Sequence, residues 1–250
     1  MAGSLRLTYV GHATVLIELD GVRILTDPIL RGRVGALRRR GPTPVRGDLD
    51  PIDAVLISHA HPDHFDGASL RTLAGDPLVI APRGLRRRAE RLSSHVQEVT
   101  VGDEVRVGDV TITAIAARHG RWPLERTVRP LGYLIEGSTR VYFAGDTARF
   151  AGMSRLAGRV DVALLPVGRW GPPVGPKRLT PHSAVAAAVL VGAKVAIPIH
   201  WGTLYVPGFE GGRWGWGSVD AAAAFEREGA DVPDVEVIVL QPGEGRDIEV

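Results

Sequence analysis

The sequence predicts an α/β (α+β) protein built as a four-layer αββα sandwich. Apolar runs with strand character fall into two groups, one before and one after Pro130, and helical segments accompany each group. Histidine or aspartate follows several of these runs directly, which is expected for ligands gathered at one edge between two sheets. We find no convincing internal repeat, although the chain divides into two strand-rich halves.

The first half is expected to be mostly strand. Apolar patterning predicts strands at residues 5–10, 13–19, 22–26, 53–57, 78–81, 97–101, 104–107 and 110–117. Helices are expected only at residues 67–74 and 84–92. A TIM barrel also places an H-x-H pair at a strand end, but it needs eight alternating strand and helix units. The first third of this chain has too little helix for that fold.

The second half contains the longer expected helices. Strands are predicted at residues 131–136, 139–144, 160–165, 194–199 and 235–240. Thr180 is the expected N-cap of a helix over 181–191, because Pro181 suits the first helical position. A further helix is expected over 218–229, with Ser218 as its cap.

Length and composition fit one globular unit. A chain of 250 residues can bury a sizeable core, and we expect a single domain over residues 1–250. No apolar run is long enough to span a membrane, and residues 1–7 lack the hydrophobic core of a signal peptide. These features predict a cytoplasmic protein. With no cysteine, the chain has no disulfides and no thiolate metal ligand.

The charge balance argues against a nucleic-acid partner. The formal net charge is only +2, so the global field is weak. Two arginine runs stand out, at residues 38–40 and 86–88. The second run lies in an expected helix, and we interpret it as a solvated face. The first lies in the irregular stretch 31–50, where it could overhang a site, but we interpret it as solvated too.

The most informative feature is a cluster of metal-ligand residues after the apolar run 54–57. Six positions hold three histidines and one aspartate, namely His59, His61, Asp63 and His64. The first two are two residues apart, so in extended chain they point to the same side. The other two lie beyond Pro62, where the chain turns, and can reach a second position. Nitrogen and carboxylate oxygen suit zinc, with manganese or iron as alternatives.

Three further strand ends repeat this pattern. The strand-like runs 110–116, 141–144 and 194–199 are followed by His119, Asp146 and His200, respectively. Each residue alone has an ordinary structural explanation. Together with the first cluster, they indicate that the ligands for two cations are collected from several strands.

These motifs, in this order, resemble the metallo-β-lactamase superfamily. The matching pieces are Gly11-His-Ala-Thr-Val-Leu-Ile17, Leu25-Thr-Asp-Pro28, the H-x-H-x-D-H at 59–64, His119, Gly145-Asp-Thr147 and Pro198-Ile-His-Trp-Gly202. Within the superfamily, the chain looks like the branch that contains ascorbate-phosphate lactonases and N-acylphosphatidylethanolamine-hydrolysing phospholipase D. The H-x-H-x-D-H is the most specific piece, and the shorter ones narrow the branch.

The resemblance implies a site for two divalent metal ions. His59, His61 and His119 would hold the first metal, while Asp63, His64 and His200 would hold the second, with Asp146 bridging both. A water molecule between two such ions is acidified enough to act as hydroxide near neutral pH. Asp63 is also expected to steer the proton during turnover. A third histidine in the cluster, in place of a glutamate, argues against the oxygen-reducing di-iron relatives.

Two residues are expected behind the ligands. Asp27 follows the strand-like run 22–26, where its carboxylate can accept the far N–H of a ligand histidine and fix its tautomer. An Asp-Pro turn would explain the same residue without a metal. His12 follows the first strand-like run and lines the pocket in this interpretation. Its alternative is a core histidine with satisfied hydrogen bonds.

Substrate contacts are assigned to residues in loops and a first helical turn. Candidates are Arg178, His182, Trp170, Trp201 and Tyr205. Arg178 stands where the resembling enzymes often have histidine, and its guanidinium would suit phosphate or carboxylate. The alternative for the aromatic residues is that they pin long loops to the body of the protein.

The leading function is therefore a binuclear metal-dependent hydrolase. A metal-bridged hydroxide would attack a small-molecule lactone, ester or phosphodiester. The alternative is a metal-dependent nuclease or RNA-processing enzyme, which salt-dependent RNA binding would favour. No room exists between Asp146 and His200 for the large inserted domain of the RNA-cleaving branch. A non-catalytic metal-binding protein is a third possibility, which the complete ligand set opposes. The sequence does not determine the oligomeric state.

Overall fold

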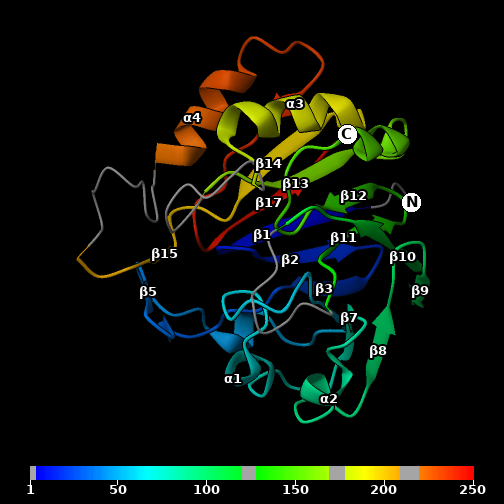
Figure 1. The fold of residues 1–250 in the computed structure, drawn as a ribbon, viewed down its shortest axis with the longest axis vertical. Helices are drawn as coiled ribbons and strands as arrows, with labels where there is room; N and C mark the ends of the chain where they lie inside the picture. The colour runs from blue at the N-terminus through cyan, green and yellow to red at the C-terminus, as the bar shows by residue number, and fades with distance from the viewer. Residues whose placement is uncertain (1–3, 120–127, 169–177, 209–219) are drawn as a thin grey trace.

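Two seven-stranded sheets lie face to face, and helices cover the outer side of each (Figure 1). The computed structural model describes residues 4–119, 128–168, 178–208 and 220–250. One sheet is covered by α3 (Pro181–Val191) and α4 (Asp220–Gly229), and the other by α1 (Gly67–Leu70) and α2 (Arg86–Ala89). The fold is thus the αββα sandwich that the sequence predicts. In the described parts of the chain, no helix combines the length and the apolar character needed to cross a bilayer.

The first sheet has the strand order β17-β1-β2-β3-β6-β7-β8. Its members are β1 (Leu5–Gly11), β2 (Thr14–Leu19), β3 (Val22–Thr26), β6 (Ala54–Leu56), β7 (Leu78–Pro82), β8 (Val96–Val99) and β17 (Glu244–Ile248). Pairing is antiparallel from β17 to β3 and parallel from β3 to β8. The parallel strands end at the same edge, which is where β6 runs into the H-x-H-x-D-H segment.

The second sheet repeats this topology in the order β16-β14-β13-β12-β11-β10-β9. Its members are β9 (Glu104–Val107), β10 (Val110–Ala116), β11 (Leu131–Glu136), β12 (Arg140–Phe143), β13 (Val162–Pro166), β14 (Val195–Ile199) and β16 (Glu236–Val237). Pairing is antiparallel from β9 to β12 and parallel from β12 to β16. The two halves therefore share the same strand order and the same pattern of antiparallel and parallel pairing, although their sequences show no repeat.

The main core fills the space between the sheets. Leu7 and Ile17 of the first sheet and Tyr133 and Phe143 of the second are fully buried in one cluster. Helix α3 joins this cluster through Ala184 and its apolar neighbours. Burial of such side chains is the dominant stabilising term, at roughly 25 cal/mol per Å² of apolar surface. The same packing holds the strand ends of both sheets in a fixed relation.

Most predicted elements are present, and the differences have local causes. The structure adds the short strands β4 (Arg33–Val34), β5 (Leu37–Arg39) and β15 (Leu204–Tyr205), which form a separate three-stranded sheet, and a 3₁₀ segment at Ala151–Leu156. Two or three residues are too few to show a period. The edge strand β17 is largely exposed and charged, so it also lacks a strand pattern. Helices α1 and α2 are four residues long each, shorter than predicted.

Helix α3 begins at the N-cap residue that the sequence predicts, Thr180. The Thr180 hydroxyl accepts a hydrogen bond from the backbone N–H of Ser183, and the Ser183 hydroxyl accepts one from the backbone N–H of Thr180. Pro181 occupies the first turn, and Gly192 ends the helix with φ 71°. These reciprocal bonds satisfy donors that the first helical turn leaves free.

Candidate metal centre

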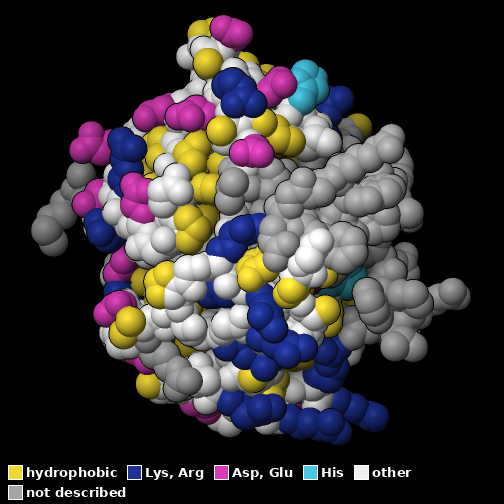
Figure 2. Space-filling view, turned by 90° about the vertical axis from the view of Figure 1, so that its left-hand side faces the viewer, with side chains coloured by type: hydrophobic (Ala, Val, Ile, Leu, Met, Phe, Trp, Pro, Cys, Tyr) yellow, Lys and Arg dark blue, Asp and Glu magenta, His cyan; other side chains and the backbone are white. Residues whose placement is uncertain are grey.

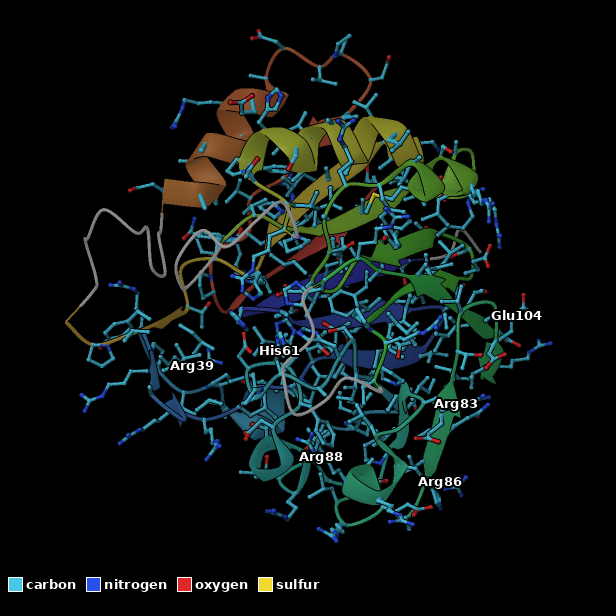
Figure 3. All side chains as sticks on the ribbon, in the orientation of Figure 1. Arg39, His61, Arg83, Arg86, Arg88 and Glu104 are labelled. Atoms are coloured by element: carbon cyan, nitrogen blue, oxygen red, sulfur yellow. The ribbon has the colours of Figure 1, made fainter. Side chains whose placement is uncertain are left out.

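The strand ends of both sheets bring the predicted ligand side chains together. His59, His61 and His119 offer ring nitrogens that all lie within 4.8 Å of one another. A second group has the same closeness and consists of His12, Asp63, His64 and His200. The first group joins the end of β6 to the end of β10, and the second joins the ends of β1, β6 and β14. Figure 3 labels His61, a partly exposed member of the first group.

Asp146 connects these two groups. Its Oδ2 atom lies 3.5 Å from Nε2 of His119 and 3.7 Å from Nε2 of His64, and its Oδ1 atom lies 3.4 Å from Nε2 of His200. The residue is only 6% exposed. One carboxylate thus faces imidazoles of both groups, each at a distance that leaves space for a cation between donor atoms.

The loop that carries the cluster is fixed by backbone hydrogen bonds. The N–H of Leu131 in β11 donates to the carbonyl oxygen of Ser58, which ties this loop to the opposite sheet. Within the loop, the N–H groups of His64 and Phe65 both donate to the carbonyl oxygen of His61. This turn contains Pro62 and directs the second half of the motif away from the first, as the sequence predicts.

A fully buried carboxylate supports ligands of both groups. Asp27 Oδ2 lies 2.7 Å from Nδ1 of His64 and accepts a hydrogen bond from the Ser58 hydroxyl at 2.5 Å. The same hydroxyl oxygen lies 2.9 Å from Nδ1 of His59. Both imidazoles are thereby oriented through Nδ1, and Nε2 is directed to the centre. Ser58 was not selected from the sequence, and its only signal there is its position directly before the motif.

His12 lies deeper in the site than the sequence predicts. Its Nε2 atom is 2.9 Å from Oδ2 of Asp63, and its ring centroid is 3.9 Å from that of His200. Its backbone N–H donates to the hydroxyl of Thr203, and its carbonyl oxygen accepts from the N–H of His200 at 2.6 Å. His12 therefore contacts a candidate ligand directly and also holds the backbone that carries another.

Three residues of the site have left-handed backbone conformations. His12, Asp27 and His200 have φ values of 61°, 33° and 63°, which are uncommon for residues with side chains. Such conformations cost free energy and persist where surrounding contacts impose them. Here each follows a strand and turns its side chain into the cluster. The contacts of His12 and Asp27 described above supply that constraint.

The electrostatics of the cluster keep Asp146 charged and His12 and His61 neutral. At His64, the carboxylates of Asp63, Asp146 and Asp27 outweigh burial and hold the pKa well above its usual range. Burial alone would raise the pKa of Asp146, but the neighbouring His200, His64 and His119 outweigh it, and that pKa lies well below its usual range. Burial lowers the pKa of His12 to about 3 and that of His61 to about 4. Neutral imidazole and ionised carboxylate are the forms that bind metal.

The donor atoms fit divalent cations. Nε2 of His59 and Nε2 of His64 are buried and make no hydrogen bond to the described residues. A buried nitrogen without a partner is costly, and a metal would satisfy both atoms. The set contains nitrogen and carboxylate oxygen, which suits zinc, manganese or iron. The carboxylate of Asp27 already accepts bonds from Ser58 and His64, so it serves as a support for the ligands.

The residues predicted to contact substrate are spread more widely than the candidate metal ligands. Trp201 is 5% exposed, stacks on Tyr9 with a centroid distance of 5.8 Å, and donates through Nε1 to the Pro198 carbonyl oxygen. This ring packs in the core and offers little surface to a substrate. His182 is largely exposed, and its Nδ1 lies 2.8 Å from Glu228 in α4.

The other three residues predicted to contact substrate are Arg178, Tyr205 and Trp170. Arg178 is partly buried and directly precedes Leu179, whose N–H donates to the carbonyl oxygen of Thr147, next to Asp146. Tyr205 lies in β15, with the guanidinium of Arg40 over its ring at 4.6 Å. Trp170 lies outside the described residues. Substrate roles for these residues remain predictions.

Comparison with known proteins agrees with this geometry. A family model described as the beta-lactamase superfamily domain matches residues 22–201. A UPF0173 metal-dependent hydrolase of Methanopyrus kandleri is 33% identical, with 96% of this chain and 98% of that protein covered. A UPF0173 protein of Pyrococcus furiosus is 31% identical over 80% of this chain and 84% of its own length. The solved metallo hydrolase Igni18 of Ignicoccus hospitalis has a TM-score of 0.78 at 23% identity, covering 99% of both chains.

The family match, the fold and the buried His and Asp cluster define a protein of the metallo-β-lactamase class. The chain belongs to the beta-lactamase superfamily domain family. Family and site together make it a metal-dependent hydrolase. The superfamily that the motifs resemble is therefore confirmed, and the narrower branch remains a prediction.

Proposed function

We propose that this chain is a binuclear enzyme that hydrolyses a small-molecule lactone, ester or phosphodiester. His59, His61 and His119 would hold one cation, Asp63, His64 and His200 would hold the other, and Asp146 would be shared. The observation that carries the proposal is the position of Asp146, whose two oxygens lie 3.4–3.7 Å from imidazoles of both groups. Ligands drawn from both sheets also support treating residues 1–250 as one domain.

Two bound cations would supply Lewis acidity and lower the pKa of a bound water to near 7. Zinc is the expected metal, with manganese or iron as alternatives. The protein must orient the imidazoles correctly, which Asp27 and Ser58 do through Nδ1 of His64 and His59. The same hydrogen bonds raise the basicity of the ligand nitrogens.

Asp63 is the residue best placed to move a proton. Its Oδ2 atom accepts from Nε2 of His12 at 2.9 Å, and Nε2 of His200 lies 3.6 Å from the same oxygen. The carboxylate is 2% exposed, and its contacts with His64, His12 and His200 keep its pKa well below the usual range despite burial. Asp63 would carry the proton to the leaving group, and His12 would hold the carboxylate in position during that transfer.

The test combines metal content with hydrolysis. Purified protein should contain about two metal ions per chain, measured by mass spectrometry of the metals. Asp146→Asn should lose metal and at least about a hundredfold in kcat/KM on whichever of a lactone, an ester and a phosphodiester the wild type cleaves. Asp109→Asn, on a largely exposed carboxylate, is the matched control. Full hydrolysis after removal of all metal would contradict the proposal.

A further inference from the structure

The three-stranded sheet β15-β5-β4 carries a row of cationic and aromatic side chains on one face. Its register pairs Arg33 with Arg38, and Arg38 with Tyr205. Directly opposed residues of antiparallel strands project to the same face. Arg40 is two residues from Arg38, continues the pairing through its N–H to the Thr203 carbonyl oxygen, and lies over the Tyr205 ring. We call Arg33, Arg38, Arg40 and Tyr205 the arginine platform.

This arrangement corrects the interpretation of residues 38–40 as one solvated run. The strand alternates, and Arg39 turns inward, where it is 9% exposed. Its guanidinium donates to the carbonyl oxygens of Val10 and Ile29 at 3.2 and 2.5 Å. Arg39 therefore anchors the small sheet to the sandwich, and its two neighbours are left on the opposite face.

Among the residues that the structure describes, the platform has no anionic partner. Like charges directly opposite each other destabilise a strand pair, yet Arg33 faces Arg38. Across the described ranges, no carboxylate lies within 4 Å of the guanidinium groups of Arg33, Arg38 or Arg40, whereas Arg31 pairs with Asp66 at 2.6 Å. Arg40 Nε is buried and has no hydrogen-bond partner there either. Three cations and an unsatisfied donor form a site that an anion would complete.

The platform is attached to the rim of the metal centre. The N–H of Arg40 donates to the carbonyl oxygen of Thr203, and the hydroxyl of Thr203 accepts from the N–H of His12. Tyr205 lies five residues beyond the candidate ligand His200. Figure 2 shows Lys and Arg side chains gathered on the face that carries β5, with Asp and Glu mostly toward the other end of the view. Figure 3 labels Arg39, the inward-facing arginine of this sheet.

We propose that the arginine platform binds a phosphate group carried by the substrate, away from the bond that is hydrolysed. A single guanidinium can satisfy a carboxylate through two parallel hydrogen bonds. Three guanidinium groups on one face match the charge and the several oxygens of a phosphate better than those of a carboxylate. The role of the platform in turnover rests on the proposed hydrolase function, because it assigns the class of substrate that the metal centre receives.

The kinetic test uses the metal-loaded enzyme and a matched pair of esters. One is 4-nitrophenyl butyrate, and the other carries a phosphate at the far end of the same acyl chain. The Arg33→Ala/Arg38→Ala variant should lower the ratio of kcat/KM for the phosphorylated over the neutral ester about tenfold, because charge-assisted hydrogen bonds are lost. Arg38→Lys should give a smaller loss. An unchanged ratio would overturn the proposal.

The matched control removes arginines of the second arginine run, at residues 86–88. Arg86→Ala/Arg87→Ala changes exposed side chains of α2, so the ratio should stay at the wild-type value. An equal fall in this control would show a general charge effect and would also overturn the proposal. Circular dichroism of each variant establishes that the fold is retained.

A binding test separates this inference from the proposed activity. Inorganic phosphate should raise the thermal midpoint of the wild type and of the α2 control more than that of the Arg33→Ala/Arg38→Ala variant. If the wild type hydrolyses neither ester but shows this difference, the phosphate site stands and the proposed hydrolysis of esters fails. If all three proteins respond equally, the platform does not bind phosphate.

Discussion

The carboxylate of Asp27 and the imidazole of His64 form a fully buried pair, with Oδ2 and Nδ1 separated by 2.7 Å. The Ser58 hydroxyl donates to the same oxygen, and Nδ1 of His59 lies 2.9 Å from that hydroxyl. One carboxylate thus orients an imidazole of each proposed metal position, directly in one case and through a hydroxyl in the other. This difference makes the two support residues experimentally separable.

Asp27→Asn should weaken both metal positions. The amide keeps the shape of the side chain, but its nitrogen would face a donor where an oxygen now accepts. Loss of such a supporting residue typically reduces metal affinity by about 10–100-fold. Competition with a chromophoric chelator measures the effect, and Asp109→Asn on the surface is the control. Unchanged affinity at both positions would show that Asp27 only shapes the turn before Pro28.

Ser58→Ala should affect the two positions unequally. It removes the hydroxyl between Asp27 and His59 and leaves the direct contact between Asp27 and His64 in place. We expect about a tenfold loss of affinity at the position served by His59, and a smaller loss at the other. A titration that resolves two binding steps measures this. Equal weakening of both steps would contradict the proposed division.

The ligand residues could be predicted because each follows a strand with a clear apolar pattern. Residues 54–57 before His59 and residues 195–199 before His200 are buried throughout, and parallel strands end at a common sheet edge. Nothing in the local pattern distinguishes Ser58 from any serine at a strand end. Its function depends on Asp27, which is distant in sequence, and only the fold brings them together.

The small sheet shows a second limit of prediction. Strands β4 and β5 contain arginines at most positions, so they show no apolar alternation. The inward turn of Arg39 depends on carbonyl oxygens of Val10 and Ile29, which belong to other segments. The sequence therefore suggests a solvated run, although one of its three arginines is a buried anchor. A charged residue in a short strand is assigned a face only by its tertiary partners.

Tyr133→Phe should destabilise the contact between the sheets at the site. The Tyr133 hydroxyl donates to the carbonyl oxygen of Ile57 at 2.7 Å, two residues before His59. Removing the donor leaves a buried acceptor unsatisfied, which costs about 1–3 kcal/mol. Tyr142→Phe is a matched control, since the buried Tyr142 hydroxyl has no hydrogen-bond partner among the described residues. Urea unfolding should show the loss for Tyr133→Phe and little or no loss for Tyr142→Phe.

Gly168→Ala should displace the backbone that carries His200. A Cβ atom at position 168 would lie 1.9 Å from the carbonyl oxygen of His200, which is backbone and has no flexible end to move aside. Overpacking of this kind costs about 3 kcal/mol and should lower metal content as well. Gly47→Ala is the control, because no atom lies within 4 Å of its added Cβ. A variant with wild-type stability and metal content would contradict the close approach of Gly168 to the carbonyl oxygen of His200.

Asp161 should make stability depend on pH in the acid range. The Arg140 guanidinium, hydrogen-bonded to this carboxylate at 2.8 Å, lowers the pKa of Asp161 to about 2, against about 3.9 in an unfolded chain. A lowered folded-state pKa stabilises the protein above pH 4, and this contribution is lost as the pH falls toward 2.

The measurement compares Asp161→Asn with wild type by urea unfolding. Asp161→Asn should cost about 1–3 kcal/mol at pH 7, and the gap from wild type should narrow steadily below pH 4. Asp247→Asn removes the exposed partner of Arg6 and should change stability by less than about 1 kcal/mol at any pH. A gap for Asp161→Asn that stays constant from pH 7 to pH 3 would assign its effect to packing rather than to the charge of the carboxylate.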